Sequence, residues 1–220
     1  MGDSVANGGT QINDDEAYPA LLEGLLGHGA EVVNASAGGW ALDNARNWLA
    51  EHGTLGARVI VLEINEGDLG QAFADGNLLD VHPSFPTRAP ACGLCEIATR
   101  YILPKIHHTS LADPGSQGGH FTPDHVAGAL QAVKAIEQQA SQAGARLVLM
   151  YWDPRNAGPG EGARRQLFAW AQQHQVPIVR PQLNRDIHAQ DLFRDAIHPT
   201  VMGNAVIAAQ LQPVVGPLLF

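Results

Sequence analysis

The length, composition and charge of the chain narrow its class before any single residue is considered. It has 220 residues, of which 45% are hydrophobic, so we expect one core and a single domain over residues 1–220. Its 13 Lys and Arg face 22 Asp and Glu, and the resulting charge of -9 excludes a surface that follows a nucleic-acid backbone. Apolar runs such as 59–62 and 147–151 are far shorter than the about 20 residues that cross a bilayer, so no membrane span is predicted. No residue pattern indicates an oligomeric state.

The first half of the chain alternates helical and strand-like patterns, which is typical of a parallel sheet covered by helices. Apolar residues at helical spacing, with glycines after the last of them, predict a helix at 18–26. A short strand at 31–34 and a second helix at 41–51 follow. The β-branched run at 58–64 is the clearest strand of this half.

The pattern is lost between about 70 and 122, which we interpret as an irregular insertion with one helix at 94–106 that Pro104 ends or kinks. It returns at Thr122, where a capping threonine and a proline indicate a helix start. The other predicted elements are a strand at 146–152, a helix at 162–174, a strand at 176–180 and a last helix at 200–211. The prediction is therefore four strands and five or six helices.

Cys92 and Cys95 are the two cysteines of the chain, in C-x-x-C spacing within the insertion. A structural zinc site would need a second such pair, and a thioredoxin-like pair would lie where a strand meets a helix. These two instead follow a proline-rich stretch at 83–90. We therefore interpret them as unrelated thiols and expect no disulfide framework.

Ligands of parallel α/β sheets bind beyond the carboxyl ends of the strands, so the loops after the strands hold the candidate site residues. A loop of small residues with glycines at 38–39 follows the first predicted strand, and its backbone can approach a ligand closely. Residues 65–68 follow the second strand. The chain opens with Gly-Asp-Ser at 2–4, and its last loop holds Asp-Ala-Ile-His-Pro at 195–199.

Ser4, Asp195 and His198 are the residue types of a nucleophilic triad. A serine becomes a useful nucleophile when a nearby base removes its proton, and histidine suits that role because its ordinary pKa lies near neutrality. Asp195 and His198 are three residues apart, so a turn can bring the carboxylate to one ring nitrogen and leave the other for Ser4. Alternatively, Ser4 belongs to a frayed terminus and Asp195 caps a turn.

Four segments, taken in order, resemble blocks I, II, III and V of the SGNH, or GDSL, hydrolases. They are 2–4, 38–39, 65–68 and 195–199, and they cover nearly the whole chain. The resemblance implies a three-layer α/β/α fold with a parallel, flavodoxin-like sheet, no metal and no cofactor. It also implies hydrolysis of carboxylic esters, with an acetyl or longer acyl ester on a carbohydrate or lipid as the substrate.

The resemblance also implies a role for each candidate residue. Ser4 attacks the ester, His198 is its base and Asp195 orients the base. The backbone N–H groups of Ser4 and Gly39 donate to the developing oxyanion, and an asparagine of block III normally gives the third donor.

The chain departs from this family at two places. Block III usually reads Gly-x-Asn-Asp, whereas this chain has Asn65-Glu66-Gly67-Asp68, so Gly67 stands where the asparagine belongs and Asn65 becomes the candidate donor. In addition, a buried strand normally precedes Gly-Asp-Ser, yet only Met1 does here. We therefore expect the first strand to be missing or truncated, and an export signal upstream of Met1 stays open.

Two other functions remain as alternatives to an esterase. One is a binding module that has the hydrolase fold and has lost its catalysis, and the other is an acyltransferase that passes the same acyl group to an alcohol. A metal site is not predicted, because His107, His108, His120 and His125 match no ligand spacing. The aromatic pair Tyr151 and Trp152 follows a strand and either lines the substrate cleft or is partly buried.

Overall fold

The computed structural model describes residues 1–27, 29–71, 87–88, 91–103, 121–153, 158–181 and 189–219. The chain divides into two compact units, one formed by 1–73 and 118–220 and the other by 74–117. All candidate site residues belong to the first unit.

The core of the first unit is a parallel sheet in the order β1-β2-β3, with β1 at Val59–Asn65, β2 at Arg146–Trp152 and β3 at Ile178–Val179. Val59 is paired with Arg146 and Asn65 with Trp152, so β1 and β2 are in register over their whole length. β3 adds a short pairing of Leu149 with Ile178. The predicted strands at 58–64, 146–152 and 176–180 are thus present, the last one shortened.

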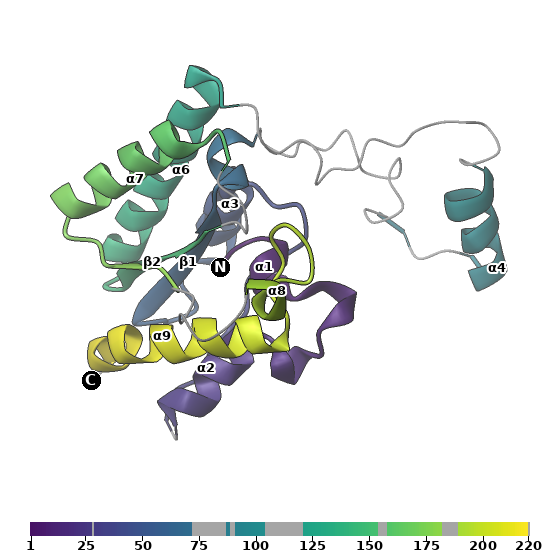
Figure 1. The fold of residues 1–220 in the computed structure, drawn as a ribbon, viewed down its shortest axis with the longest axis horizontal. Helices are drawn as coiled ribbons and strands as arrows, with labels where there is room; N and C mark the ends of the chain where they lie inside the picture. The colour runs from purple at the N-terminus through teal and green to yellow at the C-terminus, as the bar shows by residue number, and fades with distance from the viewer. Residues whose placement is uncertain are drawn as a thin grey trace. The chain divides into compact units, whose positions relative to one another are not determined.

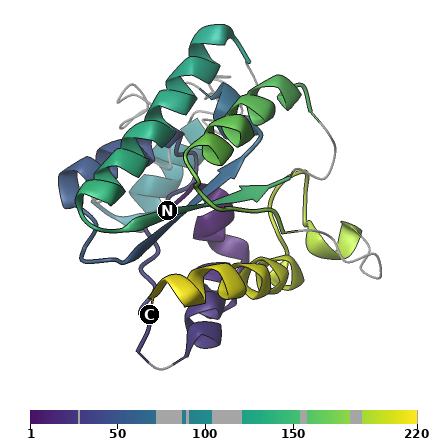
Figure 2. The same ribbon diagram turned by 90° about the vertical axis from the view of Figure 1, so that its left-hand side faces the viewer.

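Helices cover both faces of this sheet (Figures 1 and 2). One face packs against α3 (Leu42–His52), α6 (Pro123–Gln142) and α7 (Glu161–Gln173), with side chains such as Leu49, Ile136 and Leu167 in the shared core. The other face packs against α2 (Tyr18–Leu26) and α9 (Val201–Leu219). This is the three-layer α/β/α arrangement that the alternating pattern predicts.

The shorter elements of the first unit lie near the chain start and in the loops. They are α1 at Ser4–Asn7, α8 at Ala189–Leu192, and the 3-10 turns Gly9–Gln11, Asp14–Glu16 and Gly67–Gly70.

Helix α9 is longer than the predicted 200–211, because it continues through Pro213 and Pro217. Its buried residues Ile207, Leu211 and Val215 recur every four positions, so one apolar face packs along α2 and the sheet for the whole length. By length and composition α9 is also the one helix among those described that could cross a membrane. In this structure 33% of that apolar stretch is buried, on the face that packs against α2 and the sheet.

The predicted strand at 31–34 is wrong, because residues 30–35 form no sheet ladder. The nearest pairing is a single parallel bridge between Gly2 and Ser36. Met1 takes part on the opposite side, where its amino group donates to Val61 O (2.7 Å) and its carbonyl accepts from Glu63 N (2.8 Å). Met1 thus pairs with β1 and Gly2 with Ser36, and residues 31–35 form no ladder with either of them.

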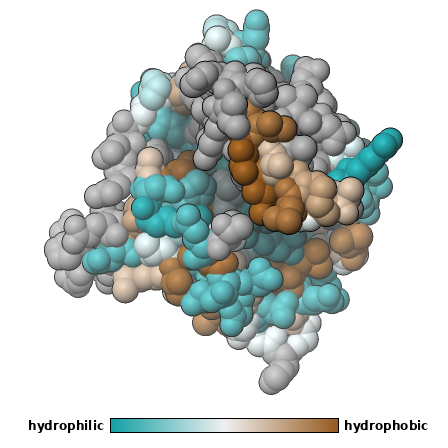
Figure 3. Space-filling model, turned by 90° about the vertical axis from the view of Figure 1, so that its right-hand side faces the viewer, coloured by the Kyte–Doolittle hydropathy of each residue, from teal (hydrophilic) through white to brown (hydrophobic). Residues whose placement is uncertain are grey.

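Within the second unit, the described residues form α4 (Gly93–Glu96) and a π-helical stretch, Ile97–Ile102. Cys92 and Cys95 form a disulfide, so the interpretation as unrelated thiols is wrong. The physical reason is local, since Cys92 precedes the first helical turn and residues three apart lie on the same side of a helix, here with Cα atoms 5.1 Å apart. Leu94 and Ile97 are exposed in this unit, and Figure 3 shows hydrophobic side chains gathered on one face.

Candidate active site

The start of the chain places Ser4 at the carboxyl end of the sheet. Gly2 passes so close to β1 that a Cβ on it would lie 2.8 Å from Glu63 Cβ, so a side chain there would push β1 and the chain start apart. Asp3 then caps the short helix α1 by accepting from Val5 N (2.7 Å). Ser4 is the first residue of that helix.

His198 lies in a tight loop that its own backbone closes. Phe193 and Pro199 form an antiparallel bridge, and Arg194 N donates to His198 O (3.0 Å). Inside the loop, Asp195 Oδ1 accepts from the N–H groups of Ile197 (2.9 Å) and His198 (2.8 Å). One oxygen of Asp195 is thus used to hold the loop backbone.

The other oxygen of Asp195 contacts the histidine ring, and the ring contacts the serine. Asp195 Oδ2 lies 2.7 Å from His198 Nδ1, and His198 Nε2 lies 2.8 Å from Ser4 Oγ. With a neutral imidazole, Nδ1–H donates to the carboxylate and Nε2 accepts from the Ser4 hydroxyl. The structure therefore brings together the three side chains that the sequence selected, across 194 positions of the chain.

The carboxylate of Asp195 is suited to remain charged. Its partial desolvation raises the pKa, but hydrogen bonds from Ile197 N, His198 N and the His198 ring outweigh this, so the pKa of Asp195 lies below its ordinary value. A charged carboxylate holds the Nδ1–H tautomer and stabilises an imidazolium when one forms.

Trp152 fixes the histidine loop to the sheet. Its indole Nε1 donates to Ile197 O (2.7 Å), and its ring packs against Phe193 at 4.9 Å between centroids. Trp152 and Tyr151 are each 1% exposed, which favours the buried alternative over a cleft lining for this pair. Sequence reasoning missed this supporting contact, and the signal for it was a tryptophan at the end of a central strand.

The Gly39 loop is held beside the chain start. Gly39 has φ +78°, a conformation that favours glycine, and its carbonyl accepts from Gln71 Nε2 (3.1 Å). Within the described part of the chain, no hydrogen bond uses the backbone N–H of Ser4 or Gly39. Gln71 is a second supporting residue that the sequence pattern did not indicate.

Asn65, at the end of β1, is 2% exposed and makes three hydrogen bonds to its neighbours. Its Nδ2 donates to Asp3 Oδ2 (3.0 Å) and its Oδ1 accepts from Gly67 N (2.8 Å). Its own N–H donates to Asp68 Oδ2 (2.7 Å). Asn65 therefore joins the block III loop to the Gly-Asp-Ser segment, and one of its two amide hydrogens is used in doing so.

Three carboxyl groups gather next to Ser4. Oxygens of Asp3, Glu63 and Asp68 lie within 4.8 Å of one another. Burial raises the pKa of Glu63 and of Asp68 well above the ordinary range, and the neighbouring Asp3 charge adds to both shifts. Burial likewise raises the pKa of Asp3, although hydrogen bonds from Val5 and Asn65 reduce that effect. The pKa values of all three groups are therefore shifted toward the protonated form.

Parts of the sequence prediction fall outside the described residues. They include His107, His108 and His120 and most of the insertion at 70–122. His125 lies in the first turn of α6, where its N–H donates to the capping Thr122.

The fold is that of the α/β/α esterases and acylhydrolases, as the resemblance to the SGNH hydrolases predicts. No family model matches the chain, and no curated protein matches it in sequence. Solved structures do match it over its whole length.

Three of these structures illustrate the likeness. A carbohydrate acetylesterase family member from Sinorhizobium meliloti has a TM-score of 0.57 and 14% identity, and the match covers 100% of this chain and 96% of that one. A catalytic mutant of an acetylxylan esterase from Geobacillus stearothermophilus has a TM-score of 0.58 and 15% identity, and the match covers 98% of this chain and 91% of that one. The psychrotrophic esterase EstA from a Pseudoalteromonas species, in a structure inhibited by monoethylphosphonate, has a TM-score of 0.59 and 14% identity. That match covers 100% of this chain and 96% of the other.

Proposed function

We propose that the protein is a serine esterase that hydrolyses carboxylic esters through an acyl-enzyme on Ser4. The observation that carries this proposal is the line of hydrogen bonds from Ser4 Oγ through His198 to Asp195, with contacts of 2.8 and 2.7 Å. Its position at the carboxyl end of a parallel sheet, where such folds bind ligands, supports it. So does the fold itself, since the structural neighbours named above are esterases.

The reaction proceeds in two halves. Ser4 Oγ attacks the ester carbonyl carbon while His198 Nε2 takes the hydroxyl proton, and Asp195 stabilises the imidazolium. The tetrahedral intermediate expels the alcohol, which receives that proton from His198. Water then attacks the acyl-enzyme with His198 again as base, and the acid and free Ser4 are released.

The developing oxyanion needs donors, and three are proposed. They are the N–H groups of Ser4 and Gly39 and the side-chain amide of Asn65. Among the described residues, the N–H groups of Ser4 and Gly39 have no hydrogen-bond acceptor, which supports this assignment. For Asn65 the support is its position at the end of β1, in contact with the segment that carries Ser4.

For the substrate we propose a short acyl ester on a carbohydrate. Its support is limited to the names of the neighbours, which include a carbohydrate acetylesterase and an acetylxylan esterase. Comparing the rates of hydrolysis of p-nitrophenyl acetate and of longer p-nitrophenyl esters tests the acyl length. Hydrolysis of acetylated xylo-oligosaccharides tests the carbohydrate part of the proposal.

The decisive experiment is covalent labelling with a fluorophosphonate, which reacts only with an activated serine. We expect one label, located by peptide mass spectrometry at Ser4, and a loss of ester turnover of about 10⁴-fold or more in Ser4→Ala and His198→Ala. Ser141→Ala and His174→Ala, at exposed positions far along the chain, are matched controls.

Each rival function has its own outcome in this experiment. An unlabelled protein with intact fold would indicate a binding module and refute the esterase. A labelled protein that forms new esters when an alcohol is added, faster than it forms acid, would indicate an acyltransferase.

A further inference from the structure

The disulfide between Cys92 and Cys95 lies at the start of a helical run, residues 93–103, in which the π-helical stretch follows α4 directly. These are the two cysteines of the chain, so the bond has no third thiol of the chain to exchange with. Both cysteines and the two residues between them are exposed. Gly93 carries no side chain, and no atom beyond its neighbours and its own helix lies within 4 Å of the place where a Cβ would stand. Among the described residues, nothing therefore shields this disulfide from a molecule in solution.

The position of this bond gives it little value as a structural link. A disulfide stabilises a protein chiefly by restricting the unfolded chain, and the restriction grows with the length of the loop that the bond closes. Cys92 and Cys95 are separated by only three positions. The first unit, 1–73 and 118–220, lies outside that loop and has its own core. An exposed bond of this kind belongs to the labile disulfides, which exchange with external thiols.

The backbone of the first helical turn favours negative charge on the Cys92 sulfur. Cys92 is the capping residue of α4, and its Sγ accepts from Cys95 N–H at 3.0 Å. Its carbonyl accepts from Glu96 N (3.0 Å), which fixes the cap against the helix. When the S–S bond opens, the same N–H group can stabilise a thiolate on Cys92, as donors at a helix start do for reactive cysteines. Cys92 is therefore the sulfur that leaves when a thiolate attacks the bond.

Apolar side chains flank the exposed disulfide. Leu94 stands between the two cysteines and is 80% exposed, and Ile97 follows it three positions later with 49% exposed. Residues three apart lie on the same face of a helix, so these two side chains form one apolar surface beside the sulfur atoms. A thiol that carries an apolar side chain removes part of this surface from water when it reacts, whereas a hydrophilic thiol does not.

We propose that Cys92 and Cys95 form a reversible dithiol–disulfide exchange site, whose partner is a peptide or protein dithiol with an apolar side chain beside its thiol. A thiolate of the partner forms a bond to Cys95 Sγ, the Cys92–Cys95 bond breaks, and the electron pair stays on Cys92 Sγ. The second thiolate of the partner then attacks the partner's own sulfur, and Cys95 leaves as a thiolate. The partner is oxidised to a disulfide, and the two protons that its thiols lose are taken up by Cys92 and Cys95. The site uses neither Ser4 nor His198, so it is independent of the proposed esterase activity.

The test uses the whole protein and two synthetic dithiol peptides, Ac-Leu-Cys-Gly-Gly-Cys-Lys-NH2 and Ac-Ser-Cys-Gly-Gly-Cys-Lys-NH2, which differ in the side chain beside the first thiol. Iodoacetamide traps the free thiols, and intact mass then counts the chains that carry two labels. We expect the leucine peptide to reduce the bond about tenfold faster than the serine peptide, and the oxidised leucine peptide to form it again. Leu94→Ser should remove the difference between the peptides. The matched control Leu25→Ser, at a leucine of the first unit that is 51% exposed, should keep it.

Two forms with a single cysteine test the direction of attack. Iodoacetamide should alkylate Cys92 in Cys95→Ser faster than Cys95 in Cys92→Ser, because the Cys95 N–H donates to the Cys92 sulfur. The reverse order would overturn the assignment of Cys92 as the leaving sulfur. A bond that survives about a hundredfold excess of the reduced leucine peptide would overturn the whole proposal, and so would equal rates with the two peptides. None of these readouts uses ester turnover, so a protein without esterase activity refutes the proposed function and leaves this test intact.

Discussion

The buried amino group of Met1 predicts a pH-dependent stability. Desolvation lowers the pKa of this amine from 8.0 to about 6, although the nearby Glu63 charge opposes the shift. The unfolded chain therefore holds a proton between pH 6 and 8 that the folded chain has released. Unfolding takes up that proton, so stability rises as the pH increases through this window.

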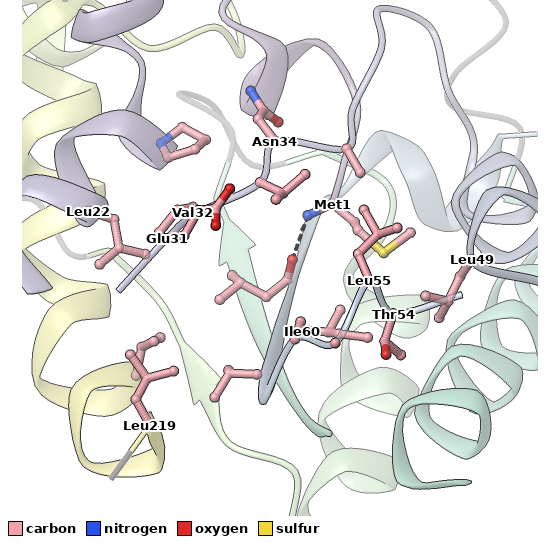
Figure 4. Close-up of a pocket in the computed structure, with 18 of the residues that line it drawn as sticks. Met1, Leu22, Glu31, Val32, Asn34, Leu49, Thr54, Leu55, Ile60 and Leu219 are labelled. Atoms are coloured by element: carbon pink, nitrogen blue, oxygen red, sulfur yellow. Dashed lines mark hydrogen bonds between the residues drawn. The ribbon is translucent and has the colours of Figure 1, made fainter. Parts of the chain in front are cut away.

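The magnitude follows from the size of the shift. Two pKa units correspond to about 2.7 kcal/mol of unfolding free energy between pH 6 and pH 8. This value is an upper limit, because the hydrogen bond from the amine to Val61 O (Figure 4) is only partly buried. Even half of it is a large fraction of the total stability of a domain.

Urea denaturation followed by tryptophan fluorescence at pH 6, 7 and 8 measures the effect. The control is the same protein with Met1 Nα-acetylated, which removes the amine and keeps every side chain of the chain, its ten histidines included. Intact mass confirms that Met1 is retained in both. The free-amine form should gain more stability with rising pH than the acetylated form, and identical pH slopes would refute the argument.

Two further predictions concern the supports of the site. Trp152→Phe removes the hydrogen bond to Ile197 O and should lower the free energy of unfolding by about 1–3 kcal/mol. Because the His198 loop then loses a contact that holds it to the sheet, kcat should fall while KM stays nearly unchanged. Steady-state kinetics with wild-type kcat would contradict this role. Glu63→Gln should stabilise the protein at pH 7 relative to pH 4, because burial raises the pKa of Glu63 above 4.5 and the folded chain is penalised as the pH rises above that value. Urea titrations at the two pH values test the second prediction, and an equal effect at both would disprove it.

The main elements of the fold were predictable because their sequence pattern and their burial agree. The helix at 18–26 and the strand at 146–152 have the predicted bounds. The helix ends at a glycine, and the strand begins where an exposed arginine is followed by buried apolar residues. The 31–34 strand failed for a different reason. Its sequence is strand-like, but a strand needs a neighbour, and whether Met1 and Gly2 could supply one was a tertiary question.

The meeting of Ser4, His198 and Asp195 in the candidate site was predictable, and the residues that support it were not. The proposed nucleophile, base and acid have distinctive residue types and spacings, which is why Ser4, His198 and Asp195 could be selected as candidates. Their supports, Trp152 and Gln71, act through one long-range hydrogen bond each, and nothing local in the sequence marks such a contact. The disulfide was missed because a C-x-x-C pair bonds only if its backbone turns as a helix begins.

Asn65 remains the most informative residue to change, because its contacts support two roles. Its Nδ2 donates to Asp3 and its Oδ1 accepts from Gly67 N, which makes it a tie between loops. The second hydrogen of the same amide is the proposed third oxyanion donor. Loss of such a donor typically lowers turnover by about 10² to 10³, with little change in KM, because the charge exists only near the transition state.

We expect Asn65→Ala to show both effects: a fall in kcat of that order and a loss of about 1–2 kcal/mol of stability from the unsatisfied Asp3 and Gly67 groups. The exposed Asn47→Ala is the matched control. Measuring kcat, KM and the free energy of unfolding in urea on the same preparation separates the two roles. Loss of the contacts between the loops lowers the free energy of unfolding, whereas loss of an oxyanion donor lowers kcat. An unchanged kcat in a less stable protein would remove Asn65 from the oxyanion hole and leave the Ser4 and Gly39 N–H groups as its two donors.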